Sequence, residues 1–220
     1  IFDNIRKFIK DTMSSNSGEI WTLFLAPFLG LPVPLLPIHI LWINLVTDIF
    51  PGLALSMEPA EEDIMQRPPR SSDEAIIGGK DLTHMTIESG IIGIGTMAAY
   101  AYGLSRYGQG PAAKTLAFNT LTLNELAHAY SSRSEHRHVF NRSHQLPPNP
   151  HLDKAILGMA GLQLVANLLP GFRNILGTAP MGLADLLVTG AGVLGPLVVN
   201  EEMKPALPEL TGPDDQDIIE

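Results

Sequence analysis

The sequence predicts an all-α protein, a six-span transmembrane helical bundle, on three observations. Charged residues make up only 17% of the 220 residues, whereas a soluble globular domain usually has about 25%. The charges are also unevenly spread, because long charge-free stretches separate short polar ones. Finally, each of these stretches approaches the roughly 20 apolar residues that a helix needs to cross a bilayer.

The first two candidate spans lie at about residues 14–33 and 38–57. No ionisable group except His39 lies between Glu19 and Asp48, and Asp48 is the one charged residue of the second span. Two apolar segments separated by a short connection are typical of a helical hairpin. We therefore expect these spans to form a hairpin that carries two carboxylates within apolar surroundings.

The other four candidate spans lie at about residues 84–105, 114–132, 153–171 and 180–200. Residues 89–105 and 155–172 carry no charge, and Glu125 and Asp185 are the one carboxylate in the fourth and sixth spans. A soluble helical bundle is the alternative interpretation. It is disfavoured because the helices of a soluble bundle are amphipathic and show charges at every turn.

Lysine and arginine are distributed asymmetrically between the predicted loops, which indicates the topology. With six spans and a cytosolic start, the inside segments hold eleven of these residues and the outside segments three. The inside group comprises Arg6, Lys7, Lys10, Arg67, Arg70, Lys80, Arg133, Arg137, Arg142, Lys154 and Lys204, and the outside group Arg106, Lys114 and Arg173. Positive residues concentrate on the cytosolic side of membrane proteins. We therefore expect a multi-pass integral membrane protein with both termini in the cytosol.

The resulting domain organisation has five parts. They are a cytosolic stalk (1–13), a first helical hairpin (14–57), a cytosolic loop (58–82), four further membrane helices (83–204) and a cytosolic tail (205–220). The first residue is Ile rather than Met, so we expect the chain to derive from something longer.

The composition excludes several other classes of protein. The 45% hydrophobic content is too high for an intrinsically disordered chain. The chain has no Cys, which excludes a disulfide scaffold and any Cys-ligated zinc or iron–sulfur site. A net charge of −9 disfavours nucleic acid as a partner, because nucleic-acid binding requires clustered Lys and Arg. The expected partner is the lipid bilayer, because of the long charge-free stretches.

Three carboxylates at membrane depth form the candidate functional site. Charged side chains inside a span are costly and mark functional sites by default. Further oxygen-bearing side chains accompany these at helical spacing, so the candidate ligands are Asn16, Glu19, Asn44, Thr47, Asp48 and Glu125. Carboxylate, amide and hydroxyl oxygens suit hard cations such as calcium. The alternative is that these groups only join neighbouring helices by hydrogen bonds, which is the favoured interpretation for Asn44 or Asn124 taken alone.

The helix of the second span is expected to break just after Asp48. Pro51 and Gly52 follow it, and this pair weakens a helix and frees backbone carbonyls. Broken helices at membrane depth are tolerated where they line a protected site. The break therefore adds backbone oxygens to the predicted cation site.

Several of these segments resemble the P-type cation-transporting ATPases, in particular their calcium-pump branch. Residues 14–19 (SSNSGE) are similar to the fifth membrane helix of that family, and residues 41–48 (LWINLVTD) to the sixth. Residues 1–9 resemble the stalk before the fifth helix, 63–70 (DIMQRPPR) the loop after the sixth, and 124–135 the eighth helix and its exit. The resemblance implies helices five to ten of such a pump.

The resemblance also implies roles for the candidate ligands. The fifth helix would supply Asn16 and Glu19, the sixth Asn44, Thr47 and Asp48, and the eighth Glu125. Calcium is the favoured cargo, because sodium pumps carry Asp where Asn44 lies, and manganese and sodium stay open. Ile49 departs from the family pattern, in which Gly is usual. His39 and His128 are candidate proton-exchange groups, although a structural role is favoured for both.

The catalytic motifs of the family are missing from this chain. It contains neither an Asp-Lys-Thr-Gly-Thr phosphorylation motif, nor a Thr-Gly-Glu-Ser loop, nor a Walker A loop. ATP and magnesium would therefore bind only in other domains, and the implied partners are cytosolic ATPase domains and the first four membrane helices. The stalk and the segment 67–70 would contact the phosphorylation domain. The alternative is a stand-alone membrane ion-binding or scaffold subunit that assembles with a catalytic partner.

Overall fold

All regular secondary structure in the described part of the chain is helical, as the sequence predicts. The computed structural model describes residues 2–60, 75–134, 138 and 146–204, and no strand occurs among them. The elements are α1 (Phe2–Phe28), α2 (Pro37–Trp42), the π-helical turn η1 (Ile43–Thr47), α3 (Ile49–Leu55), α4 (Gly79–Tyr107), α5 (Pro111–Ser131), α6 (Pro150–Leu168), α7 (Pro170–Leu176) and α8 (Leu183–Glu202). Segment 67–70, Glu135 and the tail 205–220 lie outside the described residues.

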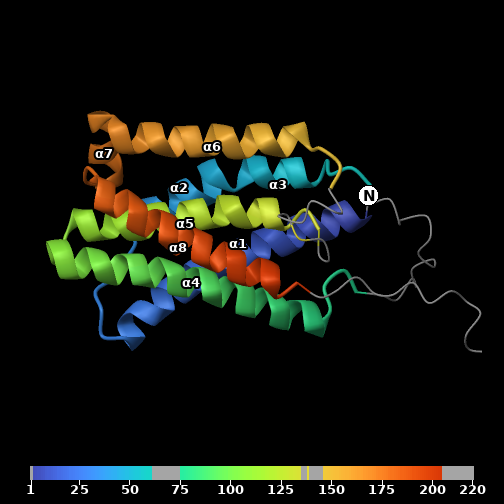
Figure 1. Cartoon of the computed structure of the whole chain (residues 1–220), viewed down its shortest axis with the longest axis horizontal. Coiled ribbons are helices and arrows are strands. Elements are labelled where there is room, and N and C mark those ends of the chain that lie inside the picture. The colour runs from blue at the N-terminus through green and yellow to red at the C-terminus, as the bar shows by residue number, and fades with distance from the viewer. Residues whose placement is uncertain (1, 61–74, 135–137, 139–145, 205–220) are drawn as a thin grey trace, which may run out of the picture.

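Successive long helices run in alternate directions along one long axis, whereas the short α7 lies across it (Figure 1). The start of α1, the end of α3, the start of α4 and the end of α8 lie at one end of the molecule, on the right of the view. The connections from α1 to α2 and from α4 to α5 lie at the opposite end. Each predicted span thus coincides with a helix or with a run of consecutive helices.

Among the described residues, two segments are long and apolar enough to cross a membrane. They are Pro37–Leu55, which combines α2, η1 and α3, and Leu183–Glu202, which is α8. The pair α6 and α7 adds a third if it counts as one span, although it bends by 92° at the break. The count of six spans therefore stays a prediction.

The bend between α6 and α7 is a feature that the sequence analysis did not include. The predicted fifth span ran straight through 153–171, whereas α6 ends at Leu168 and Pro170 begins α7. Leu169 has φ −81° and ψ 123°, an extended conformation. A residue before proline is driven out of the α region by the proline ring, so the helix stops there.

Helix α1 continues without interruption across the predicted boundary between stalk and first span. Its 27 residues include Lys7 and Asp11, both buried in the stalk part. It ends at Phe28, five residues before the predicted limit at 33. Gly30 has φ 69°, a conformation in which glycine is favoured, and the Leu31 amide caps the Ala26 carbonyl at 2.8 Å.

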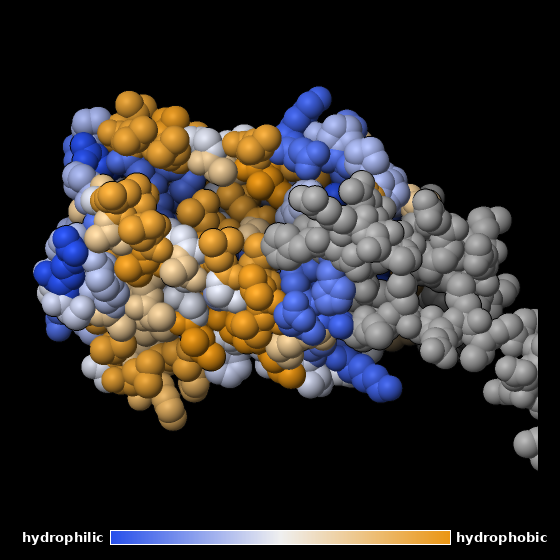
Figure 2. Space-filling view, viewed as in Figure 1, coloured by the Kyte–Doolittle hydropathy of each residue, from blue (hydrophilic) through white to orange (hydrophobic). Residues whose placement is uncertain are grey.

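The outer surface of the bundle is apolar along its middle. In Figure 2, hydrophobic side chains cover most of the central part of the visible face, and hydrophilic ones gather toward the two ends. Large apolar side chains from different helices are strongly exposed, including Ile20 (66%), Leu157 (73%) and Leu183 (75%). Exposed apolar surface on this scale fits a lipid environment rather than water.

The interior is polar to an unusual degree, and α5 is its centre. Most residues of α5 are buried, and they include Thr115, Asn119, Thr120, Asn124 and Glu125. Helices α1, α4, α6 and α8 all pack against α5. The inward polar face lowers the mean hydropathy of α5, so this buried helix is less apolar than the two candidate spans.

Small residues bring α4 and α8 into close contact. A Cβ added to Gly95 would lie 2.6 Å from the Gly192 carbonyl oxygen and 2.5 Å from Cγ of Pro196. Only a residue without a side chain fits this approach, and membrane helices commonly use small residues in this way. The contact fixes α8 against the centre of the bundle.

A buried ion pair ties the end of α3 to the segment after α5. The Arg133 guanidinium lies 2.8 Å from Oε1 of Glu58, and the side chains are 6% and 1% exposed. Asn149 donates to the other Glu58 oxygen at 2.6 Å, and Arg133 also donates to the Pro147 carbonyl. The start of α6 is thereby anchored beside α3.

Candidate cation site

The clearest part of the candidate site is the contact between Glu19 on α1 and Asn44 in η1. The Asn44 amide donates to Oε1 of Glu19 at 2.7 Å and to the Ile40 carbonyl at 3.0 Å. Glu19 is only 6% exposed. Because the Asn44 nitrogen is used in these bonds, its oxygen remains available to face a cation.

The helix containing Asn44 and Thr47 is distorted at these residues. The Asp48 amide bonds to the Ile43 carbonyl at 3.1 Å, five residues back, which defines the π-helical turn. The Thr47 hydroxyl donates to the same carbonyl at 2.8 Å. Such π turns are frequent at functional sites, because they redirect side chains and backbone carbonyls.

The position of this distortion corrects the sequence prediction. We expected the break just after Asp48, at Pro51 and Gly52, but both residues lie inside α3. Pro51 is the third residue of α3, and the first turn of a helix does not need its N–H groups as intrahelical donors. A proline also cannot donate to the Thr47 carbonyl four residues earlier, so the irregular geometry is displaced toward η1.

Gly52 has a packing role instead of a role in the break. A Cβ at this position would lie 2.8 Å from a ring carbon of Phe8. The stalk part of α1 therefore lies directly against α3. The contact joins the stalk to the helix that begins directly after Asp48.

Glu125 is the most unusual carboxylate of the site. Its side chain is 2% exposed, and neither carboxyl oxygen has a hydrogen-bond partner among the described residues. It lies in the middle of the buried face of α5, within electrostatic range of Asp48, Glu19 and Asp11. A buried carboxylate without partners is costly and requires an explanation, such as a proton or a bound cation.

The carboxylates are neighbours without being in direct contact. Asp48 interacts electrostatically with Glu19, and Glu125 with both. Across the described residues, however, no three His, Asp or Glu side chains converge closely enough to hold a metal ion. The geometry thus brings the three helices together around one polar region and leaves the full ligand set as a prediction.

Asn16 and Thr47 are directed toward their own helices. Asn16 donates to the Thr12 carbonyl at 2.9 Å, and Thr47 donates to Ile43 as described above. Both bonds use donor hydrogens, so the side-chain oxygen lone pairs remain free to accept or coordinate. Both side chains can act as neutral ligands, and their present contacts are equally compatible with a purely structural role.

Asp11 is a further acidic neighbour that the sequence analysis missed. It was assigned to the cytosolic stalk, yet its side chain is 5% exposed and accepts a hydrogen bond from the Ser132 hydroxyl at 3.2 Å. It lies within electrostatic range of Asp48 and Glu125. Asp11 precedes Glu19 by eight residues, about two helical turns. This spacing places both side chains on one face of α1 and is the sequence signal that could have identified Asp11.

The two histidines differ in their surroundings. His39 is fully buried, accepts from the Leu36 amide at 3.2 Å and stacks on Phe118. Its other nitrogen therefore carries the proton and donates to the Leu176 carbonyl at 2.8 Å, which indicates a structural role. His128 lies one turn after Glu125, and its Nδ1 has no partner among the described residues.

A second polar cluster lies beside Trp42 and is separate from the carboxylates. Gln163 accepts from the Trp42 indole at 2.8 Å and donates to Asn119 at 3.0 Å, and Asn119 also contacts Asn167. All these groups are neutral and mutually satisfied. We therefore assign this cluster to helix association rather than to ion binding.

Comparison with known proteins identifies related sequences. A family model described as "Cation transporting ATPase, C-terminus" matches residues 32–206. A calcium-transporting ATPase of Bacillus subtilis is 38% identical over 196 residues, which cover 88% of this chain and 22% of that protein. Calcium-transporting ATPase 1 of Bacillus cereus is 33% identical, with 93% and 24% covered. A calcium-transporting ATPase of Plasmodium falciparum is 27% identical, with 93% and 20% covered. The chain thus spans under a quarter of the length of these relatives.

Proposed function

The chain belongs to the cation-transporting ATPase C-terminal family, as the membrane domain of a calcium-pump-like P-type ATPase, and from that premise we propose that it contributes part of the transport site for a calcium-like cation. The proposed ligands are Asn16, Glu19, Asn44, Thr47, Asp48 and Glu125. ATP and magnesium would bind in cytosolic domains outside this chain. Those domains and four further membrane helices are the proposed partners.

The single observation that carries the proposal is the surroundings of Glu125. Its two buried oxygens have no partner among the described residues, and the carboxylates of Asp48, Glu19 and Asp11 lie within electrostatic range of it. Like charges at close range repel, so this arrangement is unfavourable unless protons or a cation neutralise it. A transport site that alternates between cation and protons would have these properties.

The chemistry of the site favours a hard cation. All six proposed ligands present carboxylate, amide or hydroxyl oxygens, and the described region contains no group of His or Cys suited to a softer metal. Calcium takes 6–8 such oxygens. The relatives named as calcium-transporting ATPases support calcium as the cargo.

Coupling to ATP hydrolysis would use α1 as a lever. Its stalk part packs on α3 through Phe8 and Gly52, and Glu19 lies further along the same helix. Tilting of α1 would change the Glu19–Asn44 contact and the exposure of Glu19 to either side. Rigid helices that move against a fixed partner are a common basis of such coupling.

We also propose a topology of six spans with both termini in the cytosol. The chain contains no Cys, so single cysteines report accessibility without background labelling from this chain. A membrane-impermeant maleimide should label Gln109→Cys from outside, and Ser72→Cys only after permeabilisation. Labelling of Ser72→Cys in intact cells would overturn the topology.

Equilibrium binding of radioactive calcium to the full-length protein tests the function. Glu125→Gln and Asp48→Asn should each lower calcium affinity at least about tenfold, because affinity for hard cations depends on ligand charge. Glu202→Gln removes an exposed carboxylate and serves as the matched control. Unchanged calcium binding in both site variants would refute the proposed site.

A further inference from the structure

Pro196 interrupts the backbone hydrogen bonding within α8. The helix runs from Leu183 to Glu202, and Pro196 is one of its buried residues. Proline has no N–H, so it cannot donate to the Gly192 carbonyl four residues earlier. In a membrane, a carbonyl freed in this way is satisfied by a neighbouring helix or side chain, because lipid tails supply no donor.

Asn124 on α5 supplies a donor for this carbonyl. Its side-chain amide donates to the Gly192 oxygen at 2.9 Å, and Asn124 is 2% exposed. Helices α4 and α8 approach closely at the same point, since a Cβ added to Gly192 would lie 3.1 Å from the Gly95 carbonyl oxygen. With alanine in place of Pro196, a backbone N–H of α8 itself could serve the carbonyl. The combination of Pro196 and Asn124 instead uses it to bond α8 to α5.

A second contact between α5 and α8 lies one turn earlier on α5. A Cβ added to Gly192 would lie 2.9 Å from the methyl carbon of Thr120, so this methyl packs closely against the α8 backbone. Thr120 and Asn124 are four residues apart and therefore lie on one face of α5. Two contacts from one face to the same residue of α8 fix the rotation of α5 about its own axis.

Glu125 projects from α5 beside this anchored face. Consecutive residues of an α-helix point about 100° apart, so Glu125 is directed away from the contact that Asn124 makes with α8. It lies within electrostatic range of Glu19 and Asp48. Within the described region no hydrogen bond holds either of its carboxyl oxygens. The direction of the carboxylate therefore depends on the rotation of α5.

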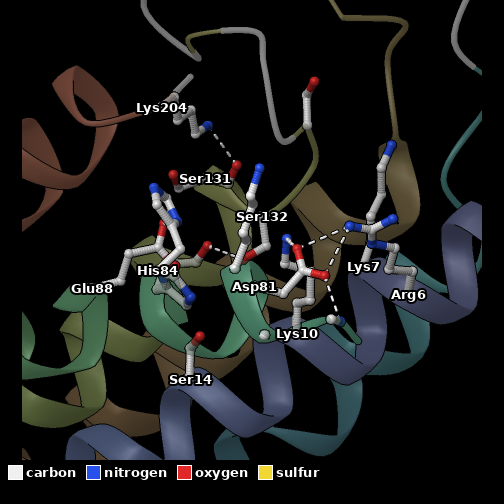
Figure 3. Close-up of a pocket in the computed structure, with 15 residues that line it drawn as sticks. Arg6, Lys7, Lys10, Ser14, Asp81, His84, Glu88, Ser131, Ser132 and Lys204 are labelled. Atoms are coloured by element: carbon white, nitrogen blue, oxygen red, sulfur yellow. Dashed lines mark hydrogen bonds and ion pairs between the residues drawn. The ribbon is translucent and has the colours of Figure 1, made fainter. Parts of the chain in front are cut away.

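Different groups join α5 and α8 at the end of the bundle. The Lys204 ammonium donates to the Ser131 carbonyl at 2.8 Å, and Figure 3 shows this contact in the wall of a cavity of about 640 Å³. The Ser131 hydroxyl donates to Glu201. Ser131 follows Glu125 by six residues, so this contact between the same two helices lies away from the carboxylate.

We propose that Asn124 is a positioning residue for Glu125 and acts through its bond to the carbonyl that Pro196 frees. The bond holds α5 in the rotation that directs the Glu125 carboxylate toward the other proposed ligands. Asn124 thereby takes part in cation binding without contacting the cation. This role rests on the proposed function of Glu125 as a cation ligand.

Equilibrium binding of radioactive calcium to the full-length protein tests this role in a cycle of variants. Asn124→Ala should lower calcium affinity about five- to tenfold, as expected when one hydrogen bond that fixes a ligand is lost. In a Glu125→Ala background the same change should have less than about a twofold effect, since no carboxylate remains to be positioned. Ser131→Ala removes a hydroxyl from the other α5–α8 contact and should bind calcium like the wild type.

Thermal unfolding without calcium separates positioning from a general effect on stability. Asn124→Ala removes the side-chain donor of the Gly192 carbonyl and should lower the unfolding midpoint. In a Pro196→Ala background a backbone N–H can serve that carbonyl, so Asn124→Ala should lower the midpoint less. Its effect on calcium affinity should persist in this background, because the side-chain bond between α5 and α8 is still lost.

The outcomes separate this role from the proposed function. Unchanged calcium affinity in Glu125→Ala would refute Glu125 as a ligand, and with it the role of Asn124. Reduced affinity in Glu125→Ala, with no effect of Asn124→Ala or an equal effect in both backgrounds, would overturn the positioning role alone. An equal loss of affinity in Ser131→Ala would do the same. So would an effect of Asn124→Ala on affinity that disappears in the Pro196→Ala background together with its effect on the midpoint.

Discussion

The side-chain amide of Asn44 lies 2.7 Å from the Glu19 carboxylate and joins α1 directly to the π-helical turn of the second predicted span. Asn44 also bonds to the Ile40 carbonyl, so its position is fixed by its own helix. Glu19 is therefore held by a group whose orientation depends on the helix distortion. This contact makes Asn44 a positioning residue for Glu19 as well as a proposed ligand.

Replacing Asn44 by Ala should weaken calcium binding to the full-length protein about 10- to 100-fold. The change removes a neutral oxygen ligand and a hydrogen bond to a charged group, which contributes about 1.5–3 kcal/mol. Calcium-dependent ATP hydrolysis measured over a calcium titration would report the shift. Asn167→Ala removes an amide from the neutral cluster and should leave the calcium dependence unchanged. Equal shifts in the two variants would refute a specific role of Asn44.

The clustering of polar side chains was predictable from sequence only where residue type and helical spacing were sufficient. Glu19, Asn44 and Glu125 fall in one polar region because each lies on the buried face of its helix. The π turn was not predictable, since its position depends on the bond of the Thr47 hydroxyl to the Ile43 carbonyl and on the missing N–H of Pro51. Asp11 was missed because its burial comes from tertiary packing, which the charge pattern of the stalk does not reveal.

The fold was likewise predictable from the sequence only in part. The long described helices overlap the predicted apolar stretches, but only Pro37–Leu55 and Leu183–Glu202, with the bent pair α6 and α7 as a third, are apolar enough over about 20 residues to cross a membrane. The bend before Pro170 lies inside an apolar stretch, so hydropathy gave no sign of it, although the proline itself did. The polar interior of α5 was anticipated only at Asn124, Glu125 and His128, because a single helix does not show which of its faces is covered.

Gly95 and Gly158 should respond oppositely to replacement by Ala. At Gly95 the new Cβ would lie 2.5 Å from Pro196 and 2.6 Å from the Gly192 carbonyl, so overpacking should cost about 1–3 kcal/mol of unfolding free energy. At Gly158 on α6 nothing lies within 4 Å, and the higher helix propensity of Ala should stabilise by up to about 1 kcal/mol. Chemical denaturation in detergent would measure both. A neutral Gly95→Ala variant would contradict the close α4–α8 contact.

Breaking the buried Glu58–Arg133 pair should destabilise the protein more than removing it altogether. Arg133→Met leaves the Glu58 carboxylate buried and should cost about 3–5 kcal/mol of unfolding free energy. In the double variant Glu58→Leu/Arg133→Met no charge remains to be desolvated, so much of that stability should return. Denaturant titrations of the two single variants and the double variant form a complete cycle. An additive cycle would show that the two side chains act independently.

Stability should depend on Asp81 in strongly acidic solution. Burial alone would raise the pKa of Asp81, but the Gly78 amide, Lys10 and Arg6 outweigh it and lower the pKa from 3.8 to about 2. A lowered pKa means that the stabilising contribution is complete above pH 3.8 and is lost as the pH falls toward about 2. In Asp81→Asn this acid-dependent loss should be absent, and the variant should be less stable at neutral pH by about 1 kcal/mol or less. Unfolding midpoints recorded from pH 6 downward, to about pH 2, would show whether the wild type alone has this slope.

In the full-length protein, Asp48→Asn should damage cation dependence more than Glu125→Gln. Asp48 directly follows the π turn, where the distorted backbone and Thr47 can add further oxygen ligands. It also interacts electrostatically with three other carboxylates, those of Glu19, Glu125 and Asp11. Loss of its charge therefore removes one carboxylate from the proposed site, and affinity for hard cations follows ligand charge. Glu125 lies in a regular stretch of α5, and the amide of Gln keeps an oxygen donor there. Calcium titrations of phosphoenzyme formation would rank the variants. If Glu125→Gln abolished calcium dependence while Asp48→Asn kept it near normal, Asp48 could not be the central ligand.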